Sequence, residues 1–162
     1  RKVQIFNACI ISKLLYSLHT AWLSKAERRR LDGFQARCLR RIEGILPSYI
    51  SRVPNTAVLG QANAQKLSST LLHHQLQYLG TLARRPSGDV VRDSVFEAGS
   101  MALRSNTKPR ARGRPRTTWA AAVFAHSEAA AGGAQYLSHF WSTSLQARAA
   151  WKVATKRYSE QF

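Results

Sequence analysis

The sequence contains few acidic residues. Only 8 of its 162 residues are Asp or Glu, against 25 Lys and Arg, which gives a formal net charge of +17. No two carboxylates have a spacing typical of a metal pair or an acid–base pair, although two-metal nucleotidyl transfer needs clustered carboxylates to hold its ions. Walker-type, G-x-S-x-G and H-E-x-x-H patterns are also missing. We therefore predict that this chain alone has no catalytic residues, no metal ligands and no cofactor.

Long apolar runs, paired cysteines and an N-terminal methionine are absent as well. No stretch of 18 apolar residues occurs, so we predict no membrane-spanning segment. The cysteines, Cys9 and Cys38, form no C-x-x-C pair, which excludes a zinc finger. We expect both to be buried apolar residues in a reducing compartment, the nucleus or the cytoplasm. The chain begins with Arg1 and has Met101 as its only methionine, so we expect it to be part of a longer protein.

Apolar residues recur at spacings of three and four along most of the chain, which predicts helices. No alternating pattern of useful strand length appears. A capping box, Ser24 with Glu27 three residues later, marks the start of the second helix. The fold class is therefore predicted to be all-α, with about three long helices, a basic linker and two shorter C-terminal helices. The expected long helices cover residues 2–23, 25–42 and 63–84; a short helix lies within 89–98, and the last two cover 118–130 and 143–158.

Positive charge is concentrated in two parts of the chain. Residues 1–60 carry 11 basic and 3 acidic side chains, and residues 101–118 carry 6 basic and no acidic ones. We predict a helical domain over 1–100, a flexible basic linker over 101–118 and a helical segment over 119–162. This basic excess indicates a polyanionic partner, because Lys and Arg that neutralise phosphates release counterions. A membrane surface is not expected.

The predicted linker contains Arg112, Arg114 and Arg116 in the sequence R-G-R-P-R. R-G-R-P is the central element of the AT-hook, in which glycine lets the backbone lie on the minor-groove floor and the arginines reach along a narrow A·T groove. Three interpretations stay open for these arginines: phosphate contact without sequence preference, a true A·T hook, or a solvated linker.

The second predicted helix offers another candidate surface. Arg30, Arg37 and Arg41 follow one another at spacings of seven and four, and such a row can track phosphates across a groove. A solvated helix face is the alternative. Aromatic residues near this helix, such as Tyr49, are expected to pack against the protein and not to stack on bases.

The order of short motifs resembles the region that follows the catalytic core in non-LTR (LINE-type) retrotransposon reverse transcriptases. Residues 2–46 resemble a family segment with an apolar helix, L-L-Y-G and Trp, followed by F-Q-x-x-C-L-R-x-I-x-G-I. The matching residues here are Leu14-Leu15-Tyr16-Ser17, Trp22, Phe34-Gln35, Cys38-Leu39-Arg40-Arg41-Ile42 and Gly44-Ile45.

Four later segments also resemble family motifs, and the first of them, residues 51–59, resembles a connector with an Asn followed by Val-Leu. Residues 76–84 resemble L-x-x-x-G-H-x-x-R, residues 113–119 match G-R-P-x-x-x-W, and residues 148–151 match R-x-x-W. Ser17 stands where the family often has glycine, and Thr81 where it often has histidine. The catalytic Y-x-D-D loop of the family does not occur in this sequence.

The resemblance implies that the first two predicted helices belong to a polymerase thumb, which grips the backbone of the template–primer. Arg30, Arg37, Arg40 and Arg41 would contact phosphates, together with the three linker arginines. The parent protein would be an RNA-directed DNA polymerase whose palm and fingers lie elsewhere and use Mg²⁺. An AT-hook-type architectural DNA-binding protein and a helical protein-interaction module remain as alternatives.

Overall fold

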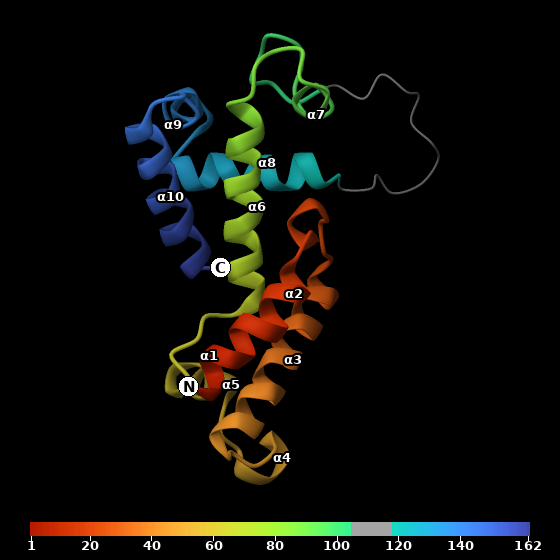
Figure 1. Cartoon of the computed structure of the whole chain (residues 1–162), viewed down its shortest axis with the longest axis vertical. Coiled ribbons are helices and arrows are strands. Elements are labelled where there is room, and N and C mark those ends of the chain that lie inside the picture. Colours follow the sequence, from red (N-terminus) through yellow and green to blue (C-terminus); the bar gives the residue numbers. More distant parts are fainter. Residues whose placement is uncertain (105–117) are drawn as a thin grey trace, which may run out of the picture. The chain divides into compact units, whose positions relative to one another are not determined.

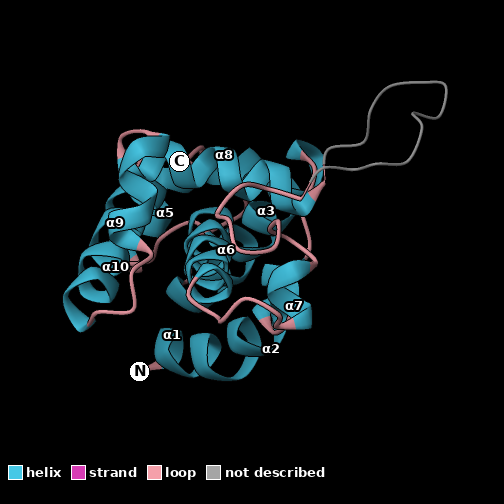
Figure 2. Ribbon diagram, turned by 90° about the horizontal axis from the view of Figure 1, so that it is seen from above, coloured by secondary structure: helices cyan, strands magenta, loops and turns pink. Residues whose placement is uncertain are grey.

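The structure is a computed structural model that describes residues 1–104 and 118–162. Within these ranges every regular element is a helix (Figures 1 and 2). Strand-like pairing in the same residues is limited to one isolated antiparallel bridge between Phe96 and Leu103. The predicted all-α class is therefore confirmed.

The helices follow one another along the described chain as a series of long and short elements (Figure 1). Four of them, α3, α6, α8 and α10, exceed three turns. The bounds are α1 Lys2–Phe6, the π-helical turn η1 Asn7–Ile11, α2 Ser12–Leu15, the 3₁₀ turn η2 Leu18–Thr20, α3 Lys25–Glu43, α4 Ser48–Ser51, α5 Asn55–Gln61, α6 Leu67–Ala83, α7 Val90–Asp93, α8 Trp119–Ala131, the 3₁₀ turn η3 Ala134–Tyr136, α9 Leu137–Phe140 and α10 Leu145–Glu160.

The chain divides into two compact units. The N-terminal unit comprises Arg1–Leu71 with Phe162, and the C-terminal unit comprises Leu72–Gln161. This division differs from the predicted boundary at residue 100. The later turns of α6 and helix α10 belong to the same unit, where Trp151 Nε1 donates a hydrogen bond to the Leu76 carbonyl at 3.1 Å.

The first helical segment is shorter than the predicted 2–23. It ends at Leu15, and Ser17 then adopts a left-handed conformation with φ 59°. This conformation costs a residue with a Cβ roughly 1 kcal/mol, which gives a physical reason for the glycine that the resembled family often has here. The 3₁₀ turn at Leu18–Thr20 follows directly.

A π-helical turn changes which side chains of this segment are buried. Helical periodicity alone places Phe6, Ile10 and Leu14 on one face. In the structure the turn at Asn7–Ile11 inserts one extra residue into the helical repeat, so Phe6, Ile11 and Leu15 are buried while Ile10 and Leu14 are exposed. Cys9 lies on the exposed side, so the prediction that both cysteines are buried is wrong for it.

Helix α3 forms as its sequence predicts. The Ser24 hydroxyl accepts from the Glu27 amide at 3.3 Å, and the Ser24 amide donates to the Glu27 carboxylate at 2.7 Å. Gly44, at φ 70°, ends the helix. The apolar side of α3 packs into the core of the N-terminal unit. That core contains the buried residues Phe6, Ile11, Leu15, Leu39, Val58, Leu67 and Leu71.

Helix α6 begins four residues later than predicted because α3 caps it. Asp32 accepts hydrogen bonds from the Ser68 amide at 2.9 Å and from the Ser68 hydroxyl at 2.7 Å. Gln35 accepts from the Leu67 amide at 3.0 Å and donates to the Gln65 carbonyl at 2.7 Å. These bonds satisfy amides that the first turn of a helix leaves without partners.

The C-terminal unit is built on an aromatic core. Trp141 lies at its centre, with ring centroids 5.8 Å from Phe96, 6.0 Å from Phe124 and 5.9 Å from Trp151, all edge to face. Helices α8 and α10 contact each other, and each buries a small residue, Ala122 on α8 and Ala147 on α10. No helix within residues 1–104 and 118–162 is long and apolar enough to cross a membrane.

Candidate nucleic-acid interface

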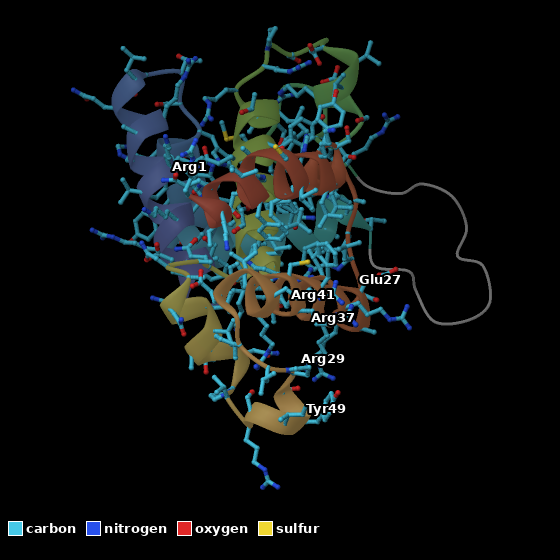
Figure 3. All side chains as sticks on the ribbon, turned by 60° about the horizontal axis from the view of Figure 1, so that its bottom comes forward. Arg1, Glu27, Arg29, Arg37, Arg41 and Tyr49 are labelled. Atoms are coloured by element: carbon cyan, nitrogen blue, oxygen red, sulfur yellow. The ribbon has the colours of Figure 1, made fainter. Side chains whose placement is uncertain are left out.

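A groove of about 560 Å³ runs beside α3 in the N-terminal unit. One wall is a side of α3, and the other is the segment that leaves α3 and continues through α4. Figure 3 shows Arg37 and Arg41 on α3, with Tyr49 on the α4 segment beyond them. The lining residues are Arg30, Gly33, Ala36, Arg37, Arg40, Arg41, Ile45, Pro47, Ser48, Tyr49 and Asn55.

Three of the predicted arginines line this groove with exposed side chains: Arg30, Arg37 and Arg41. No acidic residue belongs to the described lining, and neither Arg37 nor Arg41 forms an ion pair with a described residue. Arg30 acts on Glu27, whose pKa is lowered first by hydrogen bonds from Ser24 and then by the Arg30 charge. Arg37 and Arg41 therefore present positive charge in the groove that no described residue pairs with, while Arg30 lies near the charge of Glu27.

Arg40 has a different position from its neighbours. Its side chain is only 5% exposed. Nη1 donates to the Leu46 carbonyl at 3.2 Å and to the Ser51 hydroxyl at 3.3 Å, and Nη2 donates to the Val53 carbonyl at 2.5 Å and to Asn55 Oδ1 at 3.1 Å. The resemblance predicts that Arg40 contacts phosphate. In the structure its guanidinium instead forms hydrogen bonds to the segment from Leu46 to Asn55, which is the groove wall opposite α3. Arg40 is a structural residue.

Tyr49 lines the groove, although its sequence context predicts that it packs against the protein. That prediction is wrong, because its side chain is 80% exposed and lines the groove opposite the arginines. Its neighbours Leu46 and Ile50 are also exposed, at 58% and 54%. A Pro-Ser-Tyr segment directly after an arginine-rich helix is the only sequence signal that could have pointed to this aromatic ring.

Arg112, Arg114 and Arg116 lie outside the described residues, as does the R-G-R-P element. In the described ranges, no group of three or more His, Cys, Asp or Glu residues is placed to hold a metal ion. Comparison of the chain with protein-family models, curated proteins and solved structures gave no match.

Described residues of the later motifs meet inside the C-terminal unit; of the motif at 113–119, these are Thr118 and Trp119. Trp151 packs directly against Gly80 of α6, where a Cβ would lie 2.4 Å from the indole nitrogen. Tyr78 and Trp119 form an edge-to-face pair with centroids 5.7 Å apart. The pKa of Arg84 is lowered first by burial and then by the charge of Arg148. Gly80 and Tyr78 of α6 therefore contact Trp151 of α10 and Trp119 of α8, and Arg84 lies directly after α6.

Because His73 and His74 are adjacent on a helix, they are predicted to point in different directions and not to share a ligand. The structure agrees with this prediction. His74 is exposed, whereas His73 is half-buried and its Nδ1 has no hydrogen-bond partner. Burial lowers the pKa of His73, and the charges of His74, Lys152 and Lys156 lower it further, against a hydrogen bond to the Thr155 backbone that raises it.

This lowered pKa predicts a pH-dependent stability of the C-terminal unit. As the pH falls, the unfolded chain binds a proton on His73 before the folded unit does. The stability due to neutral His73 is therefore complete above the ordinary histidine pKa of about 6.5 and is lost as the pH falls below it. His73→Gln should lose less unfolding free energy than the parent between about pH 7 and pH 5, in urea denaturation followed by circular dichroism. Equal pH dependence of the His73 variant and the parent would contradict the assignment.

Proposed function

We propose that this chain binds the phosphate backbone of nucleic acid through the groove beside α3. The observation that carries the proposal is the row of exposed arginines Arg30, Arg37 and Arg41 in a groove with no acidic residue in its described lining. Eleven residues of α-helix separate the first from the last, a rise of roughly 16 Å. That length corresponds to about five steps of a nucleic-acid strand at 3.4 Å each.

The walls of the groove favour an extended polyanion over a small anion. The arginines are distributed along the helix and do not converge on one point, as phosphates along a backbone require. Tyr49 supplies an exposed aromatic ring on the other wall, where it can contact a sugar or an unpaired base. Arg40 fixes the segment that carries this ring, so the two walls are held together by hydrogen bonds within the N-terminal unit.

We further propose that this grip belongs to the thumb region of an RNA-directed DNA polymerase of the non-LTR retrotransposon type, acting in the nucleus or the cytoplasm. The proposal rests on the order of the motifs. It is supported by the left-handed Ser17 at a position where the family often has glycine, and by the contact between Gly80 and Trp151 from two separate motifs. The chemistry and its Mg²⁺ would belong to the palm of the parent protein, and this chain would position the template–primer.

Binding to a labelled RNA–DNA hybrid, measured by fluorescence anisotropy over a range of salt concentrations, tests the groove. We expect the logarithm of affinity to fall with the logarithm of salt with a slope of about −4 to −7, at about −0.9 per phosphate contact. Arg37→Ala/Arg41→Ala should weaken binding at least tenfold and make the slope shallower by about 2, since two contacts are lost.

The matched control is Lys156→Ala/Arg157→Ala, which removes two exposed charges from α10. It should change the affinity much less than the groove variant. Equal losses for both pairs would mean that only the overall charge matters, and a slope near zero would mean that the basic groups do not contact phosphate.

The parentage has its own test: the coding frame upstream of Arg1 should contain a Y-x-D-D-type motif, and primer extension by the isolated chain would contradict the thumb assignment.

A further inference from the structure

A second basic hollow, of about 630 Å³, lies elsewhere on the N-terminal unit, around the first turns of α3. It shares no lining residue with the groove described above. Four cationic side chains line it, and two aromatic residues contribute to its walls. These six residues are Lys25, Arg28, Arg29, Lys66, Trp22 and Phe162.

Arg28 is held in one orientation in this hollow. Its Nε donates to the Leu23 carbonyl at 3.2 Å. Its guanidinium carbon lies 3.9 Å from the ring centroid of Trp22 and 5.1 Å from that of Phe162, so aromatic rings lie against the guanidinium. Because Nε is hydrogen-bonded to Leu23 and the guanidinium lies against Trp22 and Phe162, the two terminal nitrogens of Arg28 are the atoms that can donate to a ligand. A planar arginine fork fixed in this way matches phosphate oxygens two at a time.

The cationic side chains of the hollow outnumber the acidic ones: burial lowers the pKa of Arg28, and the charge of Asp32 acts against this lowering, but three further cations remain. Asp32 is the one acidic side chain in its described lining. Both Asp32 oxygens already accept hydrogen bonds from Ser68, as part of the cap of α6. Lys25, Arg29 and Lys66 are exposed and bring three further positive charges to the same hollow.

We infer that this hollow binds a phosphate monoester, the terminal phosphate of a nucleotide. A monoester carries nearly two negative charges at neutral pH, which suits four cations around one hollow better than the single charge of a phosphodiester. The hollow is within the size range of small-ligand sites, and Trp22 and Leu23 offer apolar surface to the attached nucleoside. This inference goes beyond the proposed function, because it concerns other residues and a terminal phosphate.

The test measures the discrimination between phosphorylated and unphosphorylated ends by the full chain. A short single-stranded oligonucleotide, labelled at its 3′ end, carries either a 5′-phosphate or a 5′-hydroxyl, and both affinities are read by fluorescence anisotropy. We expect the phosphorylated form to bind about tenfold more tightly. Arg28→Lys keeps the positive charge but removes the planar guanidinium that lies against the aromatic rings, and it should remove most of this preference. Arg29→Gln/Lys66→Gln, which changes only exposed side chains, should also remove most of it.

The groove variant Arg37→Ala/Arg41→Ala separates this inference from the proposed function. It should weaken both oligonucleotides while the ratio between them stays near tenfold. Competition with AMP and with adenosine identifies the source of the phosphate. If AMP displaces the phosphorylated oligonucleotide and adenosine does not, free nucleotides also bind in the hollow. If AMP does not displace it, the phosphate must be the end of a strand. Equal affinities for the two ends in the parent chain, or an unchanged ratio in both hollow variants, would overturn the inference.

Discussion

Arg40→Ala is expected to lower the unfolding free energy of the N-terminal unit by about 3 kcal/mol. The reason is the set of hydrogen bonds that its buried guanidinium makes to the Leu46 and Val53 carbonyls, to Ser51 and to Asn55. Removing the guanidinium takes this donor from the carbonyl of half-buried Val53, although the Leu46 carbonyl keeps the hydrogen bond from the Ser51 hydroxyl. Hydrogen bonds to a charged group contribute roughly 1.5–3 kcal/mol each. Chemical denaturation followed by circular dichroism measures the loss.

Two further variants make this expectation specific. Arg40→Lys should recover only part of the stability, because one ammonium cannot reach acceptors that the two-pronged guanidinium spans. Arg41→Ala, the exposed neighbour, should change the unfolding free energy by less than about 0.5 kcal/mol while weakening nucleic-acid binding. Arg40→Ala with the stability of the parent, or Arg41→Ala with a comparable loss, would contradict the division of roles between these adjacent arginines.

Gly80→Ala should destabilise the C-terminal unit by about 3 kcal/mol. Glycine inside a helix is normally replaced by alanine with a gain of up to about 1 kcal/mol. At position 80, however, a Cβ would lie 2.4 Å from Nε1 and 2.8 Å from Cδ1 of Trp151. The indole cannot easily yield, because it is fully buried and its Nε1 is bonded to the Leu76 carbonyl. Gly33→Ala, within α3 and with no atom near its Cβ position, should be neutral or stabilising.

A double-mutant cycle shows whether Trp151 causes the effect. Trp151→Ala alone should cost about 4 kcal/mol, because a large buried side chain is lost. In that background the clash at position 80 is gone, so Gly80→Ala should become neutral or stabilising. The same loss from Gly80→Ala with and without the indole would show that the close approach to Trp151 is not its cause. Both unfolding free energies come from the same denaturation experiment.

Local signals predicted the parts of the fold that depend on a few neighbouring residues. The capping box at Ser24 and the glycine at position 44 gave the bounds of α3 within one residue. The spacing of Arg30, Arg37 and Arg41 predicted that they share a face, and they line one groove. These features could be predicted because helical geometry alone determines them.

The remaining features depend on contacts between distant residues. Helix α6 begins where Asp32 and Gln35 of another helix provide its cap, so no local pattern marks its start. Arg40 and Arg41 are adjacent arginines of identical chemistry, and only the path of the chain through Val53 makes one a buried structural group. The aromatic neighbour of the groove, Tyr49, was misassigned for the same reason.

The π-helical turn at Asn7–Ile11 also bears on how this segment can vary in length. A π turn is equivalent to one residue inserted into an α-helix, and here the insertion brings Ile11 instead of Ile10 into the core with Phe6. A relative that lacks one residue between positions 7 and 10 would regain a regular helix, with the same two side chains four residues apart and the same packing. In an alignment, a single-residue gap at this turn would therefore record a change in helical winding and no change in the core.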